Sequence, residues 1–346
     1  MSVNTISKDR FKQFVEALVQ SDQRVVGVQA RGDRFVFDDL KAADALRLDY
    51  DVTILSPRKY VLPPKEPLLK FDGRASYESL QDSEPMVLLG VHPYDMAAIN
   101  QMDVLFSQDE YDNHYMCRRK KMTIIACDVV TPSENVFAAS MGTATVDSGY
   151  DMLLTDIGDA YIVEVATDNG KALMNLMPDA RPASEADIKK RQAVWKKNEH
   201  DLNKHMLECK PSFLPKLLEK NYEHPVWEEK ARLCYSCGSC NQVCPTCYCF
   251  DVQDEVNWDL KTGVRYRAWD GCLLQDFATV AGDHNFRKDR AARFRHRLYR
   301  KGKYVPSKIG GQIACVGCGR CITACTAKIA NPVDVYNQLM ERTDIG

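Results

Sequence analysis

The sequence lacks the features that mark a membrane protein or a secreted protein. No stretch reaches the roughly 18 uncharged apolar residues of a membrane-spanning helix. The first twenty residues carry Lys8, Asp9, Arg10 and Lys12 where a secretory signal would have an apolar core. We therefore expect a cytoplasmic chain with no direct membrane span.

An excess of one charge is also absent. The 46 Lys and Arg residues are matched by 48 Asp and Glu residues, which leaves a formal net charge of -2. Nucleic acid needs a basic field, and here such a field could only be local. No nucleic acid is therefore expected as a partner.

Nucleotide-binding and metalloprotease motifs are missing as well. The sequence holds no G-x-G-x-x-G after a strand, no phosphate-binding G-x-x-x-x-G-K-[ST] and no H-E-x-x-H. Use of NAD(P)H would therefore require a partner that binds it. No nucleophile, base and orienting group stand out together, which argues against a catalytic N-terminal domain.

Cysteine is what the sequence has in abundance. Of fourteen cysteines, Cys117, Cys127 and Cys209 are scattered, and the other eleven lie between Cys234 and Cys325. A reducing cytosol keeps thiols free, and 346 residues, 45% of them apolar, can fold as two domains without disulfides. Metal binding is therefore the leading interpretation.

The hydrophobic pattern predicts an α+β chain. We expect a mixed α/β domain at residues 1–183, a helical connection at 184–228 and a helical, cysteine-rich, ferredoxin-like domain at 229–346. Ser7 is expected to cap an amphipathic helix, and Ser184 begins another with a capping box. Five short runs rich in Val and Ile predict the strands of the first domain: 25–28, 34–37, 86–91, 122–126 and 161–165.

Two runs of four cysteines share the spacing C-x-x-C-x-x-C-x-x-x-C. This spacing is typical of ferredoxin-type 4Fe-4S sites, where three thiolates hold one cluster and the fourth ligates the other cluster. The sequence therefore predicts two 4Fe-4S clusters. The ligands are assigned as Cys234, Cys237, Cys240 and Cys325 for cluster 1, and as Cys315, Cys318, Cys321 and Cys244 for cluster 2. Apolar periodicity is poor in this region, so we expect metal to organise it more than a large apolar core does.

Zinc is the main alternative to iron-sulfur clusters. Zinc sites usually take their four ligands from two separated C-x-x-C pairs, whereas each run here supplies four cysteines. The second run is followed by Thr326 where the first is followed by Pro245. That change alters the backbone leaving the loop but removes no ligand.

The 70 residues from Pro245 to Ala314 form an insert that a minimal ferredoxin would not need. The insert holds three further thiols, Cys247, Cys249 and Cys272. They could belong to a third iron-sulfur cluster, completed by Asp270, a histidine or another chain. Alternatively, they are small buried residues that line the cluster pocket.

A basic run follows the third of these thiols. Residues 284–303 carry nine cations against the single acid Asp289: Arg287, Lys288, Arg290, Arg293, Arg295, Arg297, Arg300, Lys301 and Lys303. A nucleic-acid patch, a solvated helix face, or charge compensation for anionic clusters or an acidic partner would each produce such a run. The balanced total charge favours the last two.

Several segments together are more specific than a ferredoxin pattern: residues 244–250, 269–272, 282–287 and 315–321, with 90–95 and 140–143 in the N-terminal domain. They resemble the iron-sulfur beta subunits of cytoplasmic hydrogenase and sulfhydrogenase complexes and the related iron-sulfur subunit of anaerobic sulfite reductase. The resemblance extends over most of the chain.

The resemblance implies a non-catalytic electron relay. In that family the subunit passes electrons between an NAD(P)H-binding flavoprotein subunit and a catalytic or ferredoxin-type partner of hydrogenase, heterodisulfide reductase or sulfite reductase type. Many relatives carry Cys where this chain has Tyr94, Val136 and Ala138, and a Cys matching Cys127. In those relatives the four cysteines would make a further cluster site in the N-terminal domain. Here only Cys127 remains, and one thiol cannot hold a cluster, so the N-terminal domain is predicted to be cluster-free. Cys127, Cys117 and Cys209 are then expected to be buried structural thiols.

Two other functions fit parts of the pattern. The small iron-sulfur subunits of heterodisulfide reductase and of membrane glycerol-3-phosphate dehydrogenase also carry two such cysteine runs, but an adaptor of that kind leaves Cys247, Cys249 and Cys272 unexplained. A redox sensor whose basic run binds nucleic acid is the other alternative, and it predicts binding that depends steeply on salt.

Overall fold

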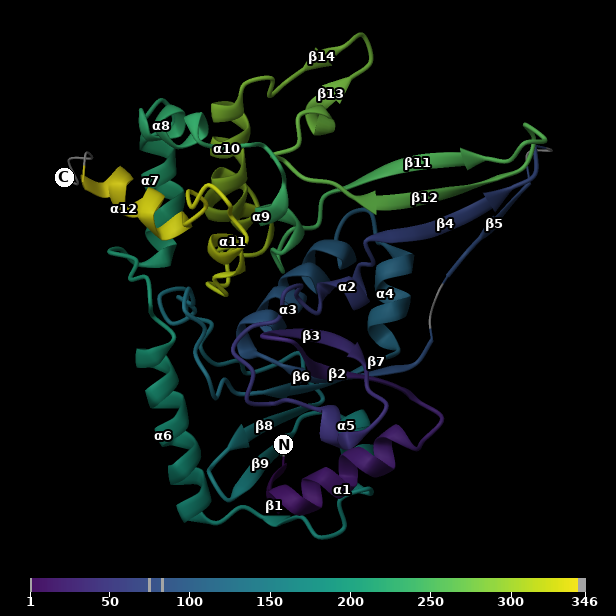
Figure 1. The fold of residues 1–346 in the computed structure, drawn as a ribbon, viewed down its shortest axis with the longest axis vertical. Coiled ribbons are helices and arrows are strands. Elements are labelled where there is room, and N and C mark those ends of the chain that lie inside the picture. The colour runs from purple at the N-terminus through teal and green to yellow at the C-terminus, as the bar shows by residue number, and fades with distance from the viewer. Residues whose placement is uncertain (1, 74–75, 82–83, 342–346) are drawn as a thin grey trace.

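The computed structural model describes residues 2–73, 76–81 and 84–341. Three parts can be followed in Figure 1: a sheet with helices on both faces, a group of helices at the C-terminal end, and a projecting arm of strands. Helix α6 (Glu185–Asp201) runs along one side from the sheet towards the C-terminal helices. The fold is therefore α+β, as predicted.

An eight-stranded sheet forms the N-terminal domain, in the order β10-β1-β9-β8-β7-β6-β2-β3. The four inner strands β2, β6, β7 and β8 are parallel, and the outer pairs are antiparallel. The bounds are β1 Ser2–Ser7, β2 Arg24–Arg31, β3 Arg34–Asp39, β6 Met86–Val91, β7 Met122–Cys127, β8 Met152–Asp156, β9 Ala160–Val165 and β10 Arg181–Pro182. All five predicted strands are present.

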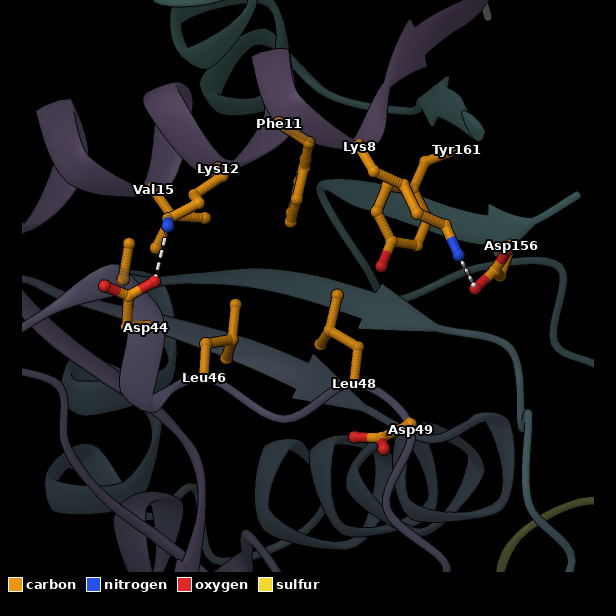
Figure 2. Close-up of a pocket in the computed structure, with 11 residues that line it drawn as sticks. Lys8, Phe11, Lys12, Val15, Asp44, Leu46, Leu48, Asp49, Asp156 and Tyr161 are labelled. Carbon is orange, nitrogen blue, oxygen red and sulfur yellow. Dashed lines mark hydrogen bonds and ion pairs between the residues drawn. The ribbon is translucent and has the colours of Figure 1, made fainter. Parts of the chain in front are cut away.

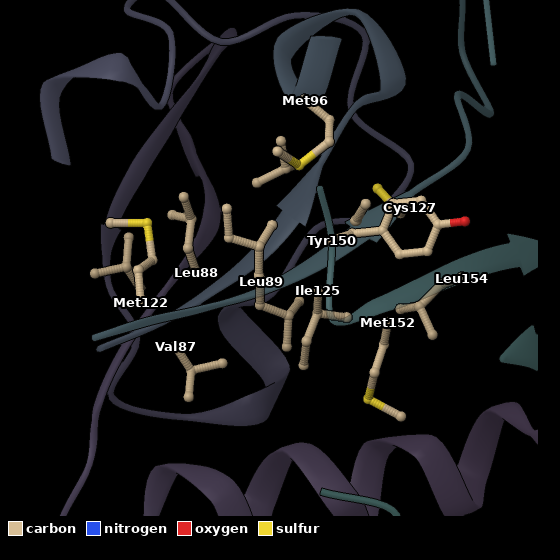
Figure 3. Close-up of a cluster of buried hydrophobic side chains, with 14 of the residues drawn as sticks. Val87, Leu88, Leu89, Met96, Met122, Ile125, Cys127, Tyr150, Met152 and Leu154 are labelled. Carbon is tan, nitrogen blue, oxygen red and sulfur yellow. The ribbon is translucent and has the colours of Figure 1, made fainter. Parts of the chain in front are cut away.

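Helices cover both faces of this sheet. One face carries α1 (Lys8–Val19), and the other carries α3 (Pro93–Ser107) with α4 (Asn113–Lys120) and the short α2 (Arg58–Val61). Ser7 caps α1, and Ser184 with Asp187 forms the predicted capping box of α6. Figure 3 shows the apolar side chains of the inner strands packed between the two helical layers. Helix α5 (Asp168–Met174) lies on the α1 side.

The C-terminal helices have an apolar core of their own. It gathers Trp227, Phe294, Leu298 and Tyr336 with Leu214, Leu217 and Leu339, all of them buried. The helices are α7 Leu214–Lys220, α8 Val226–Arg232, α9 Ser239–Gln242, α10 Arg290–Tyr299, α11 Arg320–Thr323 and α12 Pro332–Glu341. This core is larger than the weak apolar periodicity led us to expect.

The arm joins the insert to the N-terminal region. In the insert, β11 (Phe250–Val256) and β12 (Gly263–Trp269) form a hairpin, and β12 also pairs with β4 (Lys65–Phe71), which pairs with β5 (Tyr77–Ser79). Figure 1 shows this sheet extending away from the body. Trp258 lies fully exposed between β11 and β12. A short hairpin of β13 (Thr279–Val280) and β14 (His284–Asn285) follows in the insert.

Candidate iron-sulfur sites

Four predicted ligands line one hollow in the C-terminal helices, which we call site 1. Cys234, Cys237 and Cys240 come from the segment that leads into α9, and Cys325 follows α11. The walls of the hollow beside these cysteines are mostly apolar: Leu273, Phe294, Ile329 and Ala330. Cys234 and Cys240 are buried, whereas Cys237 is exposed. One ligand of site 1 therefore reaches the surface.

The other four predicted ligands line a second hollow, which we call site 2. Cys315, Cys318 and Cys321 come from the segment that leads into α11, and Cys244 follows α9. Phe137 of the N-terminal domain and the cations Arg297 and Lys301 complete its walls. The fourth cysteine of each run thus lies with the first three of the other run. That is the crossed arrangement expected for a two-cluster ferredoxin.

Local backbone geometry explains why both runs place their cysteines in this way. Gly238 and Gly319 precede α9 and α11 with φ of 73° and 76°, in the left-handed region that favours glycine. Each turn lets the chain fold back around a hollow and then begin a short helix. The third cysteine lies in that helix, and the fourth lies beyond its end, on the side of the other site.

The N-terminal domain contacts the loop of site 2 directly. The amide of Phe137 donates to the carbonyl of Gly317 at 2.7 Å, and the hydroxyl of Thr143 donates to the carbonyl of Val316 at 2.7 Å. Phe137 and Thr143 lie in the loop after β7. Parallel strands end at one edge of a sheet, so residues that follow β6 and β7 meet at the same place.

A buried ion pair adds to this contact. Arg320 donates to both carboxylate oxygens of Asp95, at 2.6 and 2.7 Å, and to the carbonyl of Thr53 at 2.8 Å. Burial raises the pKa of Asp95, and Arg320 opposes that rise. Asp95 lies in the 90–95 segment that carried the family resemblance, which gives that segment a structural role beside site 2.

Two buried cations test whether site 2 fits an anionic cluster. Lys301 is only 6% exposed, and its ammonium donates to the hydroxyl of Thr246 at 2.7 Å. Arg297 is buried too, and its Nε has no hydrogen-bond partner. Neither forms an ion pair with a carboxylate among the described residues. Burying a charge without a partner of opposite charge costs roughly several kcal/mol. An anionic group bound in the hollow would compensate the charges of these two cations.

The pKa of Lys301 leads to the same conclusion. Burial alone would lower it, but negative charge on the sulfurs of Cys244 and Cys247 raises it above its ordinary value. Lys301 is therefore charged at neutral pH, although it is enclosed. The sequence placed Lys301 in the basic run but did not single it out. Its i, i+4, i+8 spacing with Arg293 and Arg297 is the signal for one inward-facing stripe.

The rest of the basic run is divided between the interior and the surface. Arg293, Arg297 and Lys301 are buried, while Lys288 and Arg290 are exposed. Three of its cations are therefore not available to a nucleic-acid backbone. The buried cations of the run are therefore placed to compensate negative charge at the cysteine sites, and its exposed cations contact solvent.

The three insert thiols gather beside site 2 but line neither hollow. The side-chain amide nitrogen of Asn241 donates to the sulfur of Cys272 at 3.4 Å and to the sulfur of Cys247 at 3.6 Å. Cys249 lies near Cys272 and Arg300. Cys247 is also within hydrogen-bonding reach of Cys244. The structure thus brings the three together, packed against a buried amide.

The scattered cysteines lie apart from both sites. Cys127 ends β7 and is buried, as expected, but Cys117 and Cys209 are only partly buried. Tyr94, Val136 and Ala138 pack together with Val316 and Cys318 in an apolar cluster beside site 2. The absence of a cluster from the N-terminal domain stays a prediction.

Another hollow lies between α1 and the loop at residues 43–49 (Figure 2). Its charged side chains are paired: Lys8 with Asp156 at 2.8 Å, Lys12 with Asp44 at 2.5 Å, and Asp49 with Arg47, outside the lining, at 2.7 Å. The lining contains no cysteine. Among the described residues, no three Cys, His, Asp or Glu side chains converge closely enough to hold a single metal ion. The thiols of sites 1 and 2 are spread around the walls of their hollows, as ligands of a multi-atom cluster would be.

Comparison with known proteins agrees with this geometry. Residues 233–329 match the 4Fe-4S dicluster domain family, which covers both cysteine runs and the insert. The beta subunit of sulfhydrogenase 2 from Pyrococcus furiosus is 31% identical over 345 residues, covering 97% of this chain and 98% of that protein. The chain belongs to the family of iron-sulfur hydrogenase beta subunits.

Membership of this family settles the cofactor type. The dicluster domain carries two 4Fe-4S clusters, as the cysteine spacing predicted. The match to the sulfhydrogenase protein covers the N-terminal domain as well, so the family includes the sheet that contacts site 2. Within the described part of the chain, no helix combines the length and apolar composition that a membrane crossing requires.

Proposed function

We propose that this chain is a cytoplasmic electron-relay subunit of a multisubunit oxidoreductase of the sulfhydrogenase type. It passes single electrons between an NAD(P)H-binding flavoprotein subunit and a catalytic partner of hydrogenase, heterodisulfide reductase or sulfite or sulfur reductase type. The observation that carries the proposal is the pair of adjacent hollows, each lined by four cysteines from two crossed runs.

The residues would act as ligands and as an electrostatic frame. Cys234, Cys237, Cys240 and Cys325 would hold cluster 1, and Cys315, Cys318, Cys321 and Cys244 would hold cluster 2. Clusters of this type accept and release one electron at a time, whereas NAD(P)H gives a hydride and needs a flavin to divide the pair. Arg297 and Lys301 would offset the negative charge that reduction adds at site 2.

Arg297 also connects the two sites. Its guanidinium lies near Cys240 of site 1 and near Cys321 and Cys244 of site 2. A single buried cation between two clusters stabilises an electron on either one. This position supports transfer between the clusters within one chain.

The first test is the anaerobic content of iron and acid-labile sulfide per chain, followed by EPR during stepwise reduction. About eight irons would support two clusters. About twelve would add a third cluster, and Cys247, Cys249 and Cys272 would be its first candidate ligands. Zinc without sulfide would overturn the proposal.

A second test addresses the relay itself. In the complex purified with its natural subunits, NAD(P)H is expected to reduce the clusters of this chain, and the isolated chain is expected not to respond. Reduction of the isolated chain by NAD(P)H would contradict the dependence on a flavoprotein partner.

A further inference from the structure

The two sites differ in how they meet the surface. Site 2 contacts the N-terminal domain, and each of its four cysteines is buried or half-buried. At site 1, Cys237 is exposed and Tyr235 in the same loop is 73% exposed. An electron that leaves or enters the chain therefore has its most direct route at site 1.

The segment that carries Cys237 exposes two large, mostly apolar side chains. Leu233 and Tyr235 flank Cys234 in the sequence and are 60% and 73% exposed. Exposed aromatic and aliphatic side chains next to each other are costly to leave in water, and tyrosine is enriched in protein interfaces. Burial of these two side chains by a partner would also exclude water from the mouth of site 1.

Unpaired cations surround these two side chains, which we call the apolar centre. Arg290 donates to the carbonyl of Cys234 at 3.1 Å, and Lys288 lies two residues before it on the loop that leads into α10. Arg232 immediately precedes Leu233. All three are exposed, and none forms an ion pair with a carboxylate among the described residues. With Asp289 between Lys288 and Arg290, the three cations and this acid, which we call the rim, carry a net charge of +2, and Glu228 and Glu229 lie on the preceding turn of α8.

The loop geometry holds this rim next to the thiols. Arg293 donates to the hydroxyl of Ser236 at 3.1 Å and to the carbonyls of Arg287 and Lys288. Arg293 is buried, so it connects the loop of site 1 to the basic loop from the inside. The rim and the apolar centre are thereby parts of one surface.

We propose that Arg232, Leu233, Tyr235, Lys288 and Arg290 form a docking surface for an acidic redox protein that presents a one-electron cofactor to site 1. The proposal rests on the proposed function, since it names the partner chemistry of that relay. Charge complementarity selects an acidic partner, and the apolar centre brings its cofactor close to Cys237.

The test uses the full chain with its clusters and an acidic two-cluster ferredoxin as the probe. Electron exchange is followed by stopped flow under anaerobic conditions at ionic strengths from about 0.05 to 0.5 M. The variant is Arg232→Glu with Lys288→Glu. The matched control is Lys189→Glu with Lys196→Glu, two exposed lysines of α6 far from site 1.

With the unaltered chain, the exchange rate is expected to fall as salt increases. The site 1 variant is expected to lose about tenfold or more at low salt and most of its salt dependence. The control is expected to stay within about twofold, as distant surface charges are screened. Equal rates and equal salt slopes for the variant and the unaltered chain would overturn the proposal.

Two further measurements separate this proposal from the proposed function. Leu233→Ser should lower the rate and leave the salt slope unchanged, because it removes apolar contact but no charge. A slope that changed with Leu233→Ser would contradict the division into centre and rim. Iron content and EPR after chemical reduction show whether both clusters remain. Absence of clusters from the unaltered chain would contradict the proposed electron relay. Intact clusters with an exchange rate that the site 1 variant does not change would contradict only the docking surface.

Discussion

Sites 1 and 2 are built on the same cysteine spacing, yet they differ at the residue before the second cysteine. Site 1 has Ser236 there and site 2 has Gly317, and both have positive φ, 54° and 64°. A Cβ on Gly317 would lie 2.5 Å from the carbonyl oxygen of Phe137. Ser236 instead has its hydroxyl bonded to Arg293. The cysteine motif thus has the same backbone conformation at this position in both sites. Contact with the N-terminal domain determines whether a side chain fits there.

The two sites also differ in charge. Lys301 and Arg297 line site 2, whereas the described lining of site 1 contains no cation and Arg297 reaches that site only at the carbonyl of Cys240. A cation close to a cluster stabilises its reduced form. Solvent exposure also affects the reduction potential, but it places no fixed charge beside the cluster. One motif thus yields a site that contacts the N-terminal domain and a site with one exposed ligand, Cys237.

The largest expected effects come from matched ligand variants. Cys237→Ser and Cys318→Ser should each lose about four of about eight irons. Only Cys318→Ser should also loosen the N-terminal loop at residues 135–143, since that loop bonds to the site 2 segment. Hydrogen exchange there should accelerate about tenfold or more. Equal exchange in both variants would show that the two sites do not differ in this coupling.

The next effect concerns potential. Lys301→Met removes a buried positive charge, so reduction of cluster 2 becomes less favourable and its potential falls. At an effective dielectric constant of about 20, a neighbouring unit charge contributes on the order of a few kcal/mol, which corresponds to a fall on the order of 100 mV. Potentiometric EPR measures the shift.

The control for this change is Lys303→Met. Lys303 is partly exposed and pairs with Glu219 at 3.4 Å, so its removal should move neither potential by more than a small fraction of that amount. A shift of cluster 1 as large as that of cluster 2 would remove the electrostatic distinction between the sites.

A smaller effect is expected from exchanging residues between the motifs. Gly317→Ser places a side chain against the backbone of Phe137 and should destabilise the chain by about 1–3 kcal/mol. Ser236→Gly should cost less than about 1 kcal/mol, since it removes one partly buried hydrogen bond. Chemical denaturation of both variants measures the difference. A similar cost for the two would mean that contact with Phe137 does not explain the glycine.

The cysteine spacing was enough to predict two clusters, because each motif is a local turn followed by a short helix. The assignment of four ligands to each cluster stays a prediction, and the cysteines that line each hollow support it. Contacts between distant segments could not be read in this way. Asp95 and Arg320 are 225 positions apart and carry no periodic signal, although Asp95 lies in a segment that the family resemblance had marked. The pairing of β12 with β4 was missed for the same reason, since strand partners are selected by the folded context.

The smallest expected effect tests whether the last difference between the motifs matters. The carbonyl of Cys244 accepts a hydrogen bond from the amide of Cys247, with Pro245 at the second position of the turn, and the carbonyl of Cys325 accepts one from the amide of Lys328, with Thr326 at that position. Proline suits this position, and the amide of Thr326 has no hydrogen-bond partner among the described residues. Thr326→Pro should therefore leave the iron content unchanged and stabilise the chain by about 0.4–1 kcal/mol, because it restricts the unfolded chain. Chemical denaturation measures this gain, and a loss of stability or iron would show that the turns at sites 1 and 2 are not equivalent.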